Sequence, residues 1–203
     1  SDFMYELDEV YTVEITLSDD AYNSLSSDPY EYVEATLDFD GTYIEKIGVR
    51  LMGRYGSYRH ISGKPSFKLS FNEFSPGQNL FGLEKVNLKN MVTDYSQIHD
   101  VMGYAVHNAA GVPAPRVGYA WVILNGTDYG LYSNIEPYEE HFLQRHFDDP
   151  TGNLYDGDYF LFDTGGYSLV DFTASQDDYF QLDQGEDVGL VDVIAITDAV
   201  SAS

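Results

Sequence analysis

The sequence predicts an α+β protein, in which helices are inserted along an antiparallel sheet. Three observations lead to this fold class. Segments in which apolar and polar residues alternate recur up to residue 135 and are rich in β-branched side chains. Two pairs of these segments are joined by hairpin signals, Asp40-Gly41 and Asn125-Gly126. One segment between the strand pairs instead has the three- and four-residue apolar spacing of an amphipathic helix.

The first three strands are expected at 10–17, 33–39 and 43–52, where apolar residues occupy every second position. Ser18, followed by two aspartates, offers the N-cap of a short helix after the first strand. The Asp40-Gly41 turn makes the second and third strands a hairpin.

A basic loop with three glycines, residues 53–65, leads to further strands at 66–71 and 84–90. Alternation places Phe67, Leu69 and Phe71 on one face and Lys68 on the other. In the second of these strands Lys85, Asn87 and Lys89 are expected to face outward.

A helix is expected from Asp94 or Ser96 to Ala110, packed on the sheet, and Gly111 and Pro113 end it. Its apolar positions are Ile98, Val101, Met102, Ala105, Val106 and Ala109.

Strands at 117–124 and 129–135 follow, and Pro137 suits the first turn of a helix that reaches about residue 147. The remainder is rich in Gly, Asp and Tyr. It is expected to be irregular, with a short strand near 159–162 and a helix over 188–200.

Charge is distributed unevenly along the chain. The formal net charge of −24 argues against binding to nucleic acid or anionic membranes, and no apolar stretch is long enough for a membrane span. However, residues 46–89 hold eight of the ten Lys and Arg residues against two acids, a balance of +6. These bases either pair with acids on neighbouring strands or form an anion site.

The order of strand, glycine loop, lysine-bearing strand and helix is compatible with a phosphate site. Glycines let backbone amides approach phosphate oxygens, and a strand lysine supplies positive charge. Lys68 is the candidate lysine and Asp100 the candidate helix acid that holds it; the basic neighbours are Arg50, Arg54 and Lys64. The alternative is a structural glycine loop, because neither the P-loop nor the GxGxxG pattern is present.

Other chemistry has little support. The absence of Cys excludes thiol catalysis and Cys-ligated metal sites, and no His pair has the spacing of a helical zinc site. Asp156 and Asp158 flank a glycine, so calcium or magnesium binding there stays open beside a simple turn. Glu136, Glu139 and Glu140 are too close in sequence for a glycosidase acid pair that faces across a cleft.

Several motifs together resemble the CotH family, named for a spore-coat protein. They occur in the family's order and spacing and extend to about residue 156. The motifs are VRLMG at 49–53, KPSFKLSF at 64–71, VNL at 86–88, AAGVPAPR at 109–116, LNG at 124–126, G-L-Y at 130–132, Glu136, Phe142-Leu143 and GNLY at 152–155.

The resemblance implies a secreted or surface protein, part of a spore coat or cell surface, with the N-terminal portion of an atypical protein-kinase-like fold. Such a protein would transfer phosphate from ATP, with Mg or Mn, to Ser or Thr of extracellular or coat proteins. Lys68 would contact the phosphates, Glu136 would be the second catalytic residue, and Arg50 and Lys64 would flank them.

The chain also departs from the family pattern. Asp156 stands where the family often has Lys, and the family's later catalytic acids are expected beyond Ser203, so the catalytic set is expected to be incomplete. The resemblance places a kinase-like region at 1–155 and the start of an acidic C-terminal region at 156–203. The alternative function is a non-catalytic extracellular domain for coat assembly, surface attachment or carbohydrate contact, which the eighteen tyrosines would suit.

Overall fold

The computed structural model describes residues 1–54, 56–157, 159–161, 167–169, 172–173, 179–187 and 189–202. The chain divides into two compact units, Ser1–Phe142 and Leu143–Ser203. Each is considered by itself.

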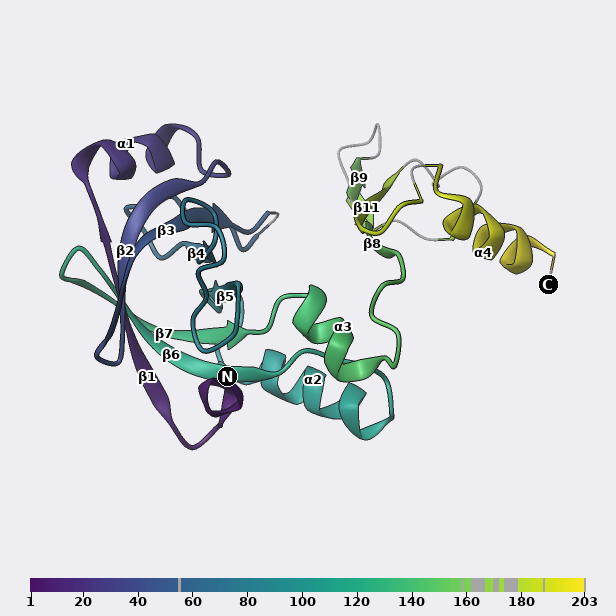
Figure 1. Ribbon diagram of the computed structural model, residues 1–203, viewed down its shortest axis with the longest axis horizontal. Helices are drawn as coiled ribbons and strands as arrows, with labels where there is room; N and C mark the ends of the chain where they lie inside the picture. The colour runs from purple at the N-terminus through teal and green to yellow at the C-terminus, as the bar shows by residue number, and fades with distance from the viewer. Residues whose placement is uncertain are drawn as a thin grey trace. The chain divides into compact units, whose positions relative to one another are not determined.

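The first unit is a closed barrel of seven strands (Figure 1). Around the barrel the strands follow the order β1-β2-β3-β4-β5-β7-β6, and they are β1 (Val10–Leu17), β2 (Val33–Phe39), β3 (Thr42–Met52), β4 (Ser66–Ser70), β5 (Lys85–Lys89), β6 (Val117–Leu124) and β7 (Thr127–Ile135). All pairs are antiparallel except β1 with β6, whose parallel pairing closes the barrel. The expected α+β class and most of the antiparallel pairing are therefore confirmed. Closure was not predicted, and it leaves none of these strands as an open edge.

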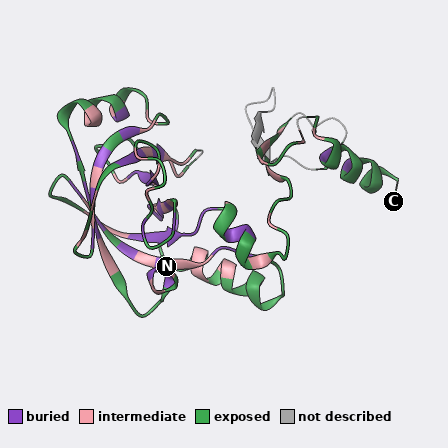
Figure 2. Cartoon of the chain, in the orientation of Figure 1, coloured by how far each residue is buried: buried purple, intermediate pink, exposed green. Residues whose placement is uncertain are grey.

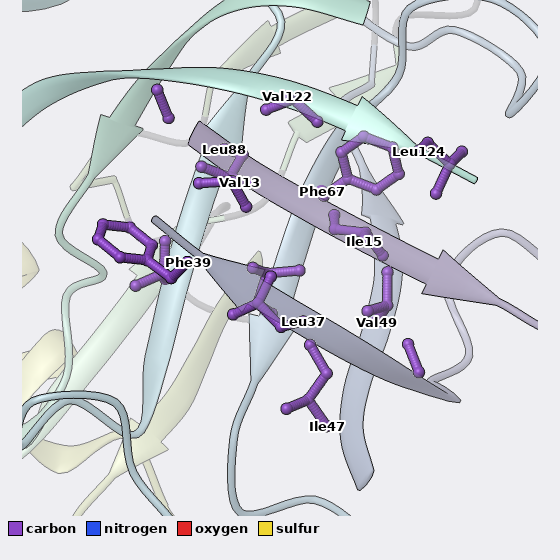
Figure 3. Packing of buried hydrophobic residues seen from close by; sticks show 14 of the residues in the cluster. Val13, Ile15, Leu37, Phe39, Ile47, Val49, Phe67, Leu88, Val122 and Leu124 are labelled. Atoms are coloured by element: carbon purple, nitrogen blue, oxygen red, sulfur yellow. The ribbon is translucent and has the colours of Figure 1, made fainter. Parts of the chain in front are cut away.

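One face of every barrel strand points into a common hydrophobic core (Figure 3). Val49, Phe67 and Val122 are completely buried, and Val13, Ile15, Leu37 and Leu88 are at most 1% exposed. Each side chain of this kind contributes roughly 1.5–3 kcal/mol when removed from water. The alternation seen in the sequence thus assigns the inner face correctly, and the residues between these positions form the outer face.

The N-terminal segment is clamped to β6 by a close backbone contact. A 3-10 helix, η1 (Asp2–Tyr5), crosses the strand at Gly118, where a Cβ would lie 2.7 Å from the Met4 carbonyl oxygen and 2.8 Å from Tyr5 Cα. The Asn134 amide also donates to the Met4 carbonyl, at 3.1 Å. Only glycine fits at position 118 without moving the backbone of η1.

Two helices lie on the barrel unit, α1 (Asp19–Ser27) and α2 (His99–Ala109). Ser18 caps α1 as predicted, since its side chain accepts from the Ala21 amide. Helix α2 starts later than predicted because Asp94 folds the preceding loop, accepting hydrogen bonds from Ser96 and from the His99 amide. Burial would raise the pKa of Asp94, but these hydrogen bonds outweigh it and lower the pKa to about 2.

The face of α2 predicted to pack on the sheet does not do so. Met102 is 55% and Val106 62% exposed, and no residue of α2 is buried (Figure 2). Of the predicted apolar positions Val101 alone is partly buried, and the other partly buried positions of α2 are Asp100, Gly103 and Tyr104. Helical spacing located the helix but did not identify its contacts with the barrel, among them those of the first-turn acid Asp100 described below.

Helix α3 (Glu140–His146) follows the barrel and spans the division between the units. The second unit contains two hairpin-like pairs and a helix: β8 (Leu154–Gly157) with β11 (Phe180–Gln184), β9 (Tyr159–Leu161) with β10 (Tyr167–Leu169), and α4 (Val191–Ser201). The predicted strand near 159 and the predicted final helix are present, although Val188 lies outside the described residues.

The boundary between the compact units falls at 142/143. Strand β8 pairs with β11, so residues 154–157 belong to the second unit. The division at 155/156 that the family resemblance implies stays a prediction. Among the described residues, no helix combines the length and apolar character that crossing a membrane requires.

Candidate functional site

Four of the ten basic residues, Arg50, Lys68, Lys85 and Lys89, lie on the outer face of the barrel. Strand pairing places Arg50 of β3, Lys68 of β4, Asn87 of β5 and Ile135 of β7 side by side in that order. We call these four residues the outer row. Lys85 and Lys89 lie two positions to either side of Asn87 on the same strand face. One surface thus holds Arg50, Lys68, Lys85 and Lys89, which are spread over 40 positions in sequence.

Lys68 and Lys85 share a carboxylate. The Nζ of Lys68 lies 3.4 Å and the Nζ of Lys85 2.9 Å from Oε1 of Glu139, which directly precedes α3. All three side chains are 24–30% exposed, so the cluster remains accessible to solvent. Burial lowers the pKa of Lys85, but the hydrogen bond and charge of Glu139 outweigh it and raise the pKa overall. Lys85 is therefore charged at neutral pH.

A small pocket opens beside this cluster. Its empty volume is about 330 Å³, part of it open to solvent, and it is lined by Leu83, Glu84, Lys85, Glu136, Pro137, Glu139, Glu140 and His141. Lys85 and Glu139 thus line both the pocket and the lysine cluster.

Glu136, the predicted second catalytic residue, is held in a buried ion pair. It is 1% exposed, and its Oε1 accepts from Nη2 and Nε of Arg116 at 2.7 and 3.1 Å. Its Oε2 accepts from the Arg116 backbone amide at 3.0 Å, and Arg116 also contacts Asp2 and the ring of Tyr5. This geometry favours a structural role for Glu136, and the carboxylate that reaches Lys68 belongs to Glu139.

Asp100 does not hold Lys68, so its prediction as the helix partner is wrong. Its Oδ1 accepts from Lys89 Nζ at 2.6 Å and its Oδ2 from Ser133 Oγ at 3.0 Å. Lys89 lies at the end of β5, where the first turn of α2 meets the barrel. Lys68 lies one strand away and is reached by the residue before α3 instead.

The other predicted phosphate-binding residues are dispersed. Arg50 is in the outer row and stacks over Tyr32, with its guanidinium carbon 5.4 Å from the ring centroid. Lys64 turns to the core: its Nζ donates to the Leu131 carbonyl at 2.7 Å and lies 4.8 Å from the Tyr132 ring centroid, and burial lowers its pKa. Arg54 lies in the turn after β3, where its carbonyl accepts from Ser57 and Tyr58.

The predicted metal residues find no support in the described residues. Asp156 is exposed on β8, and Asp158 lies outside the described residues. Within the part of the chain that the structure describes, no three Asp, Glu or His side chains are grouped closely enough to hold a metal ion.

Sequence reasoning missed that Glu139 contacts both Lys68 and Lys85. The outward position of Lys85 was correctly read from the alternation in β5. That Glu139 reaches Lys68 depends on how the segment after β7 folds back over β4 and β5, and no local pattern signals that contact.

Comparison with known proteins bears on this arrangement. A family model described as CotH kinase protein matches residues 53–200, which include Lys68, Lys85 and Glu139. No curated protein matches the chain.

Proposed function

Because the chain belongs to the CotH kinase protein family, we propose that it is a protein kinase that phosphorylates Ser or Thr residues of secreted, cell-surface or spore-coat proteins with ATP. The observation that carries this proposal is the ion pair between Lys68 and Glu139. In protein kinases a strand lysine contacts the nucleotide phosphates while a helix glutamate holds it in place. Lys68 in the middle of β4 and Glu139, the residue directly before α3, form a comparable pair.

The local electrostatics support a polyanionic substrate. Arg50, Lys68 and Lys85 set three positive charges against the one carboxylate of Glu139 on the outer face, in a chain of net charge −24, while Glu84 and Glu140 line the adjoining pocket. The acidic surface of the rest of the protein repels polyanions, so a polyanion can approach the protein only at the small basic patch. A nucleoside triphosphate suits this arrangement better than a nucleic acid does.

In the proposed reaction the Ser or Thr hydroxyl oxygen attacks the γ-phosphorus of ATP. The new P–O bond forms as the bond to the β-phosphate oxygen breaks; ADP leaves and the hydroxyl proton is released. Lys68 neutralises charge on the phosphates, and Glu139 orients Lys68. The Mg or Mn ion expected with ATP is assigned no ligand, since the described acids do not form a group for one.

Nucleotide binding by paired variants tests the proposal. Lys68→Gln removes one positive charge from the site, and Lys46→Gln removes the same charge from an exposed position of β3. A charge-assisted contact contributes about 1.5–3 kcal/mol, so we expect Lys68→Gln to weaken ATP binding about 10- to 150-fold in calorimetry. Lys46→Gln should bind as the wild type does.

Phosphate transfer is measured separately, by mass spectrometry of a Ser- and Thr-rich acceptor such as casein incubated with the protein, ATP and Mg²⁺ or Mn²⁺. ATP binding by the wild type decides the proposal, and any phosphate that the wild type adds should be absent with Lys68→Gln. If the wild type does not bind ATP, the kinase proposal fails. The non-catalytic extracellular binding domain is then the better account of this chain.

A further inference from the structure

Glu139 contacts its two lysines unequally. Its Oε1 accepts a hydrogen bond from Nζ of Lys85 at 2.9 Å, whereas Nζ of Lys68 lies 3.4 Å from the same oxygen. Hydrogen bonds from nitrogen to oxygen in proteins are about 2.7–3.2 Å long, so the contact of Lys68 is an ion pair without a hydrogen bond. Lys85 is therefore the closer partner of Glu139, although Lys68 is the lysine that we assign to the nucleotide.

The charges of this cluster do not balance. Two ammonium groups share one carboxylate oxygen, so the cluster of Lys68, Lys85 and Glu139 has one positive charge in excess. All three side chains are partly exposed, and an anion from solvent can reach that charge. If Lys85 carried no charge, Lys68 and Glu139 would cancel, and the cluster would offer an anion no net charge.

The fold supplies Lys85 as the second cation at Glu139. Lys68 pairs with Asn87 across β4 and β5, and Lys85 is two positions from Asn87 on the same face. Lys68 and Lys85 are therefore diagonal neighbours, a separation that long side chains span. Lys85 also lines the small pocket together with Glu139. The charge of Glu84, next to Lys85 in sequence, acts on Lys85 less than that of Glu139 does.

We propose that Lys85 is a positioning residue, which engages Glu139 and so leaves the ammonium of Lys68 available to a phosphate of the nucleotide; this inference rests on the proposed function. An ammonium group has three donor protons, and a carboxylate oxygen that already accepts from Lys85 competes less for those of Lys68. Without Lys85, Glu139 would form its hydrogen bond with Lys68 instead, and an incoming phosphate would have to break it. Lys85 thus acts through Glu139 and does not touch the nucleotide.

Calorimetry of ATP binding by Lys85→Gln, Glu139→Gln and the double variant tests this role. We expect Lys85→Gln to weaken ATP binding about 5-fold, the factor that a partly exposed ion pair gives. In the Glu139→Gln background the same replacement should change ATP binding less than about twofold, because the competing carboxylate is gone. Lys46→Gln removes an equal charge from an exposed position of β3 and should leave ATP binding unchanged in both backgrounds.

Direct contact between Lys85 and ATP predicts a different result. Lys85→Gln would then weaken binding equally in both backgrounds, which overturns this inference and leaves the proposed function intact. Full ATP binding by Lys85→Gln also overturns the inference alone. Partly exposed ion pairs contribute little to stability, so the thermal midpoints of all these variants should stay within a few degrees of the wild type, and weaker binding then does not reflect unfolding. Absence of ATP binding by the wild type overturns both proposals.

Discussion

Replacing Glu136 by Gln separates a structural acid from a functional one. The carboxylate of Glu136 is 1% exposed and binds the guanidinium and the backbone amide of Arg116. Breaking a buried ion pair from one side costs about 3–5 kcal/mol, because the remaining charge is left without its partner. Arg116 keeps Asp2 as a second partner, so we expect the lower end, about 3 kcal/mol.

Urea denaturation followed by Trp121 fluorescence measures this effect in the barrel, because Trp121 lies on β6 and the chain has a single Trp. With a slope of about 2 kcal/mol per molar urea, a loss of about 3 kcal/mol lowers the midpoint by about 1.5 M. The control is Glu139→Gln, since Glu139 is 27% exposed and its ion pairs contribute less than about 1 kcal/mol to stability.

The two variants should also differ in nucleotide binding. Glu136→Gln should retain ATP binding at temperatures where it is folded, whereas Glu139→Gln should lose part of it because Lys68 is no longer oriented. A midpoint shift for Glu136→Gln below about 0.5 M, or one no larger than that of Glu139→Gln, would refute the structural role that we assign to Glu136.

Three further variants test the fold around the site. The pKa of Asp94 is lowered to about 2 in the folded chain, so its contribution to stability is complete above about pH 4 and is lost as the pH falls towards 2. The loss of stability caused by Asp94→Asn, measured from urea midpoints, should therefore be smaller at pH 2.5 than at pH 6. An equal loss at both pH values would contradict this. Gly118→Ala forces a Cβ against the Met4 carbonyl and should cost about 1–3 kcal/mol in the same urea assay, whereas an unchanged midpoint would show that η1 moves freely. Asn125 makes two hydrogen bonds with the backbone of Leu17 and has a φ of 48°. Asn125→Gly loses the hydrogen bonds but tolerates this φ, so it should destabilise the protein by about 1–2 kcal/mol, and Asn125→Ala should destabilise it by more. Equal effects of the two variants would mean that the backbone conformation contributes nothing.

Much of the barrel was readable from the sequence because strand residues alternate between two environments. Phe67 and Leu69 had to face the core if Lys68 faced water, and the same reasoning placed Lys85 and Asn87 outward on β5. Turn chemistry at Asp40-Gly41 and Asn125-Gly126 correctly joined the hairpins. These are local properties, set by side-chain period and backbone preference, so a single sequence contains them.

Helix positions were less well determined than strand positions. Apolar spacing predicted α2, but Met102 and Val106 are exposed and the helix is fixed to the barrel through Asp100. Asp100 pairs with Lys89 while most of the apolar stripe is exposed, and spacing alone cannot reveal a partner that lies on another strand.

The sequence by itself determined that this chain has a basic surface within an acidic protein and that Lys68 lies on that surface. Only the tertiary structure decided which acid forms an ion pair with which base. Glu136 precedes Glu139 by three residues, yet one is buried against Arg116 and the other lies between Lys68 and Lys85. The physical reason is that charge pairing acts over a few ångströms in space, and barrel closure together with the return of the segment before α3 sets those distances.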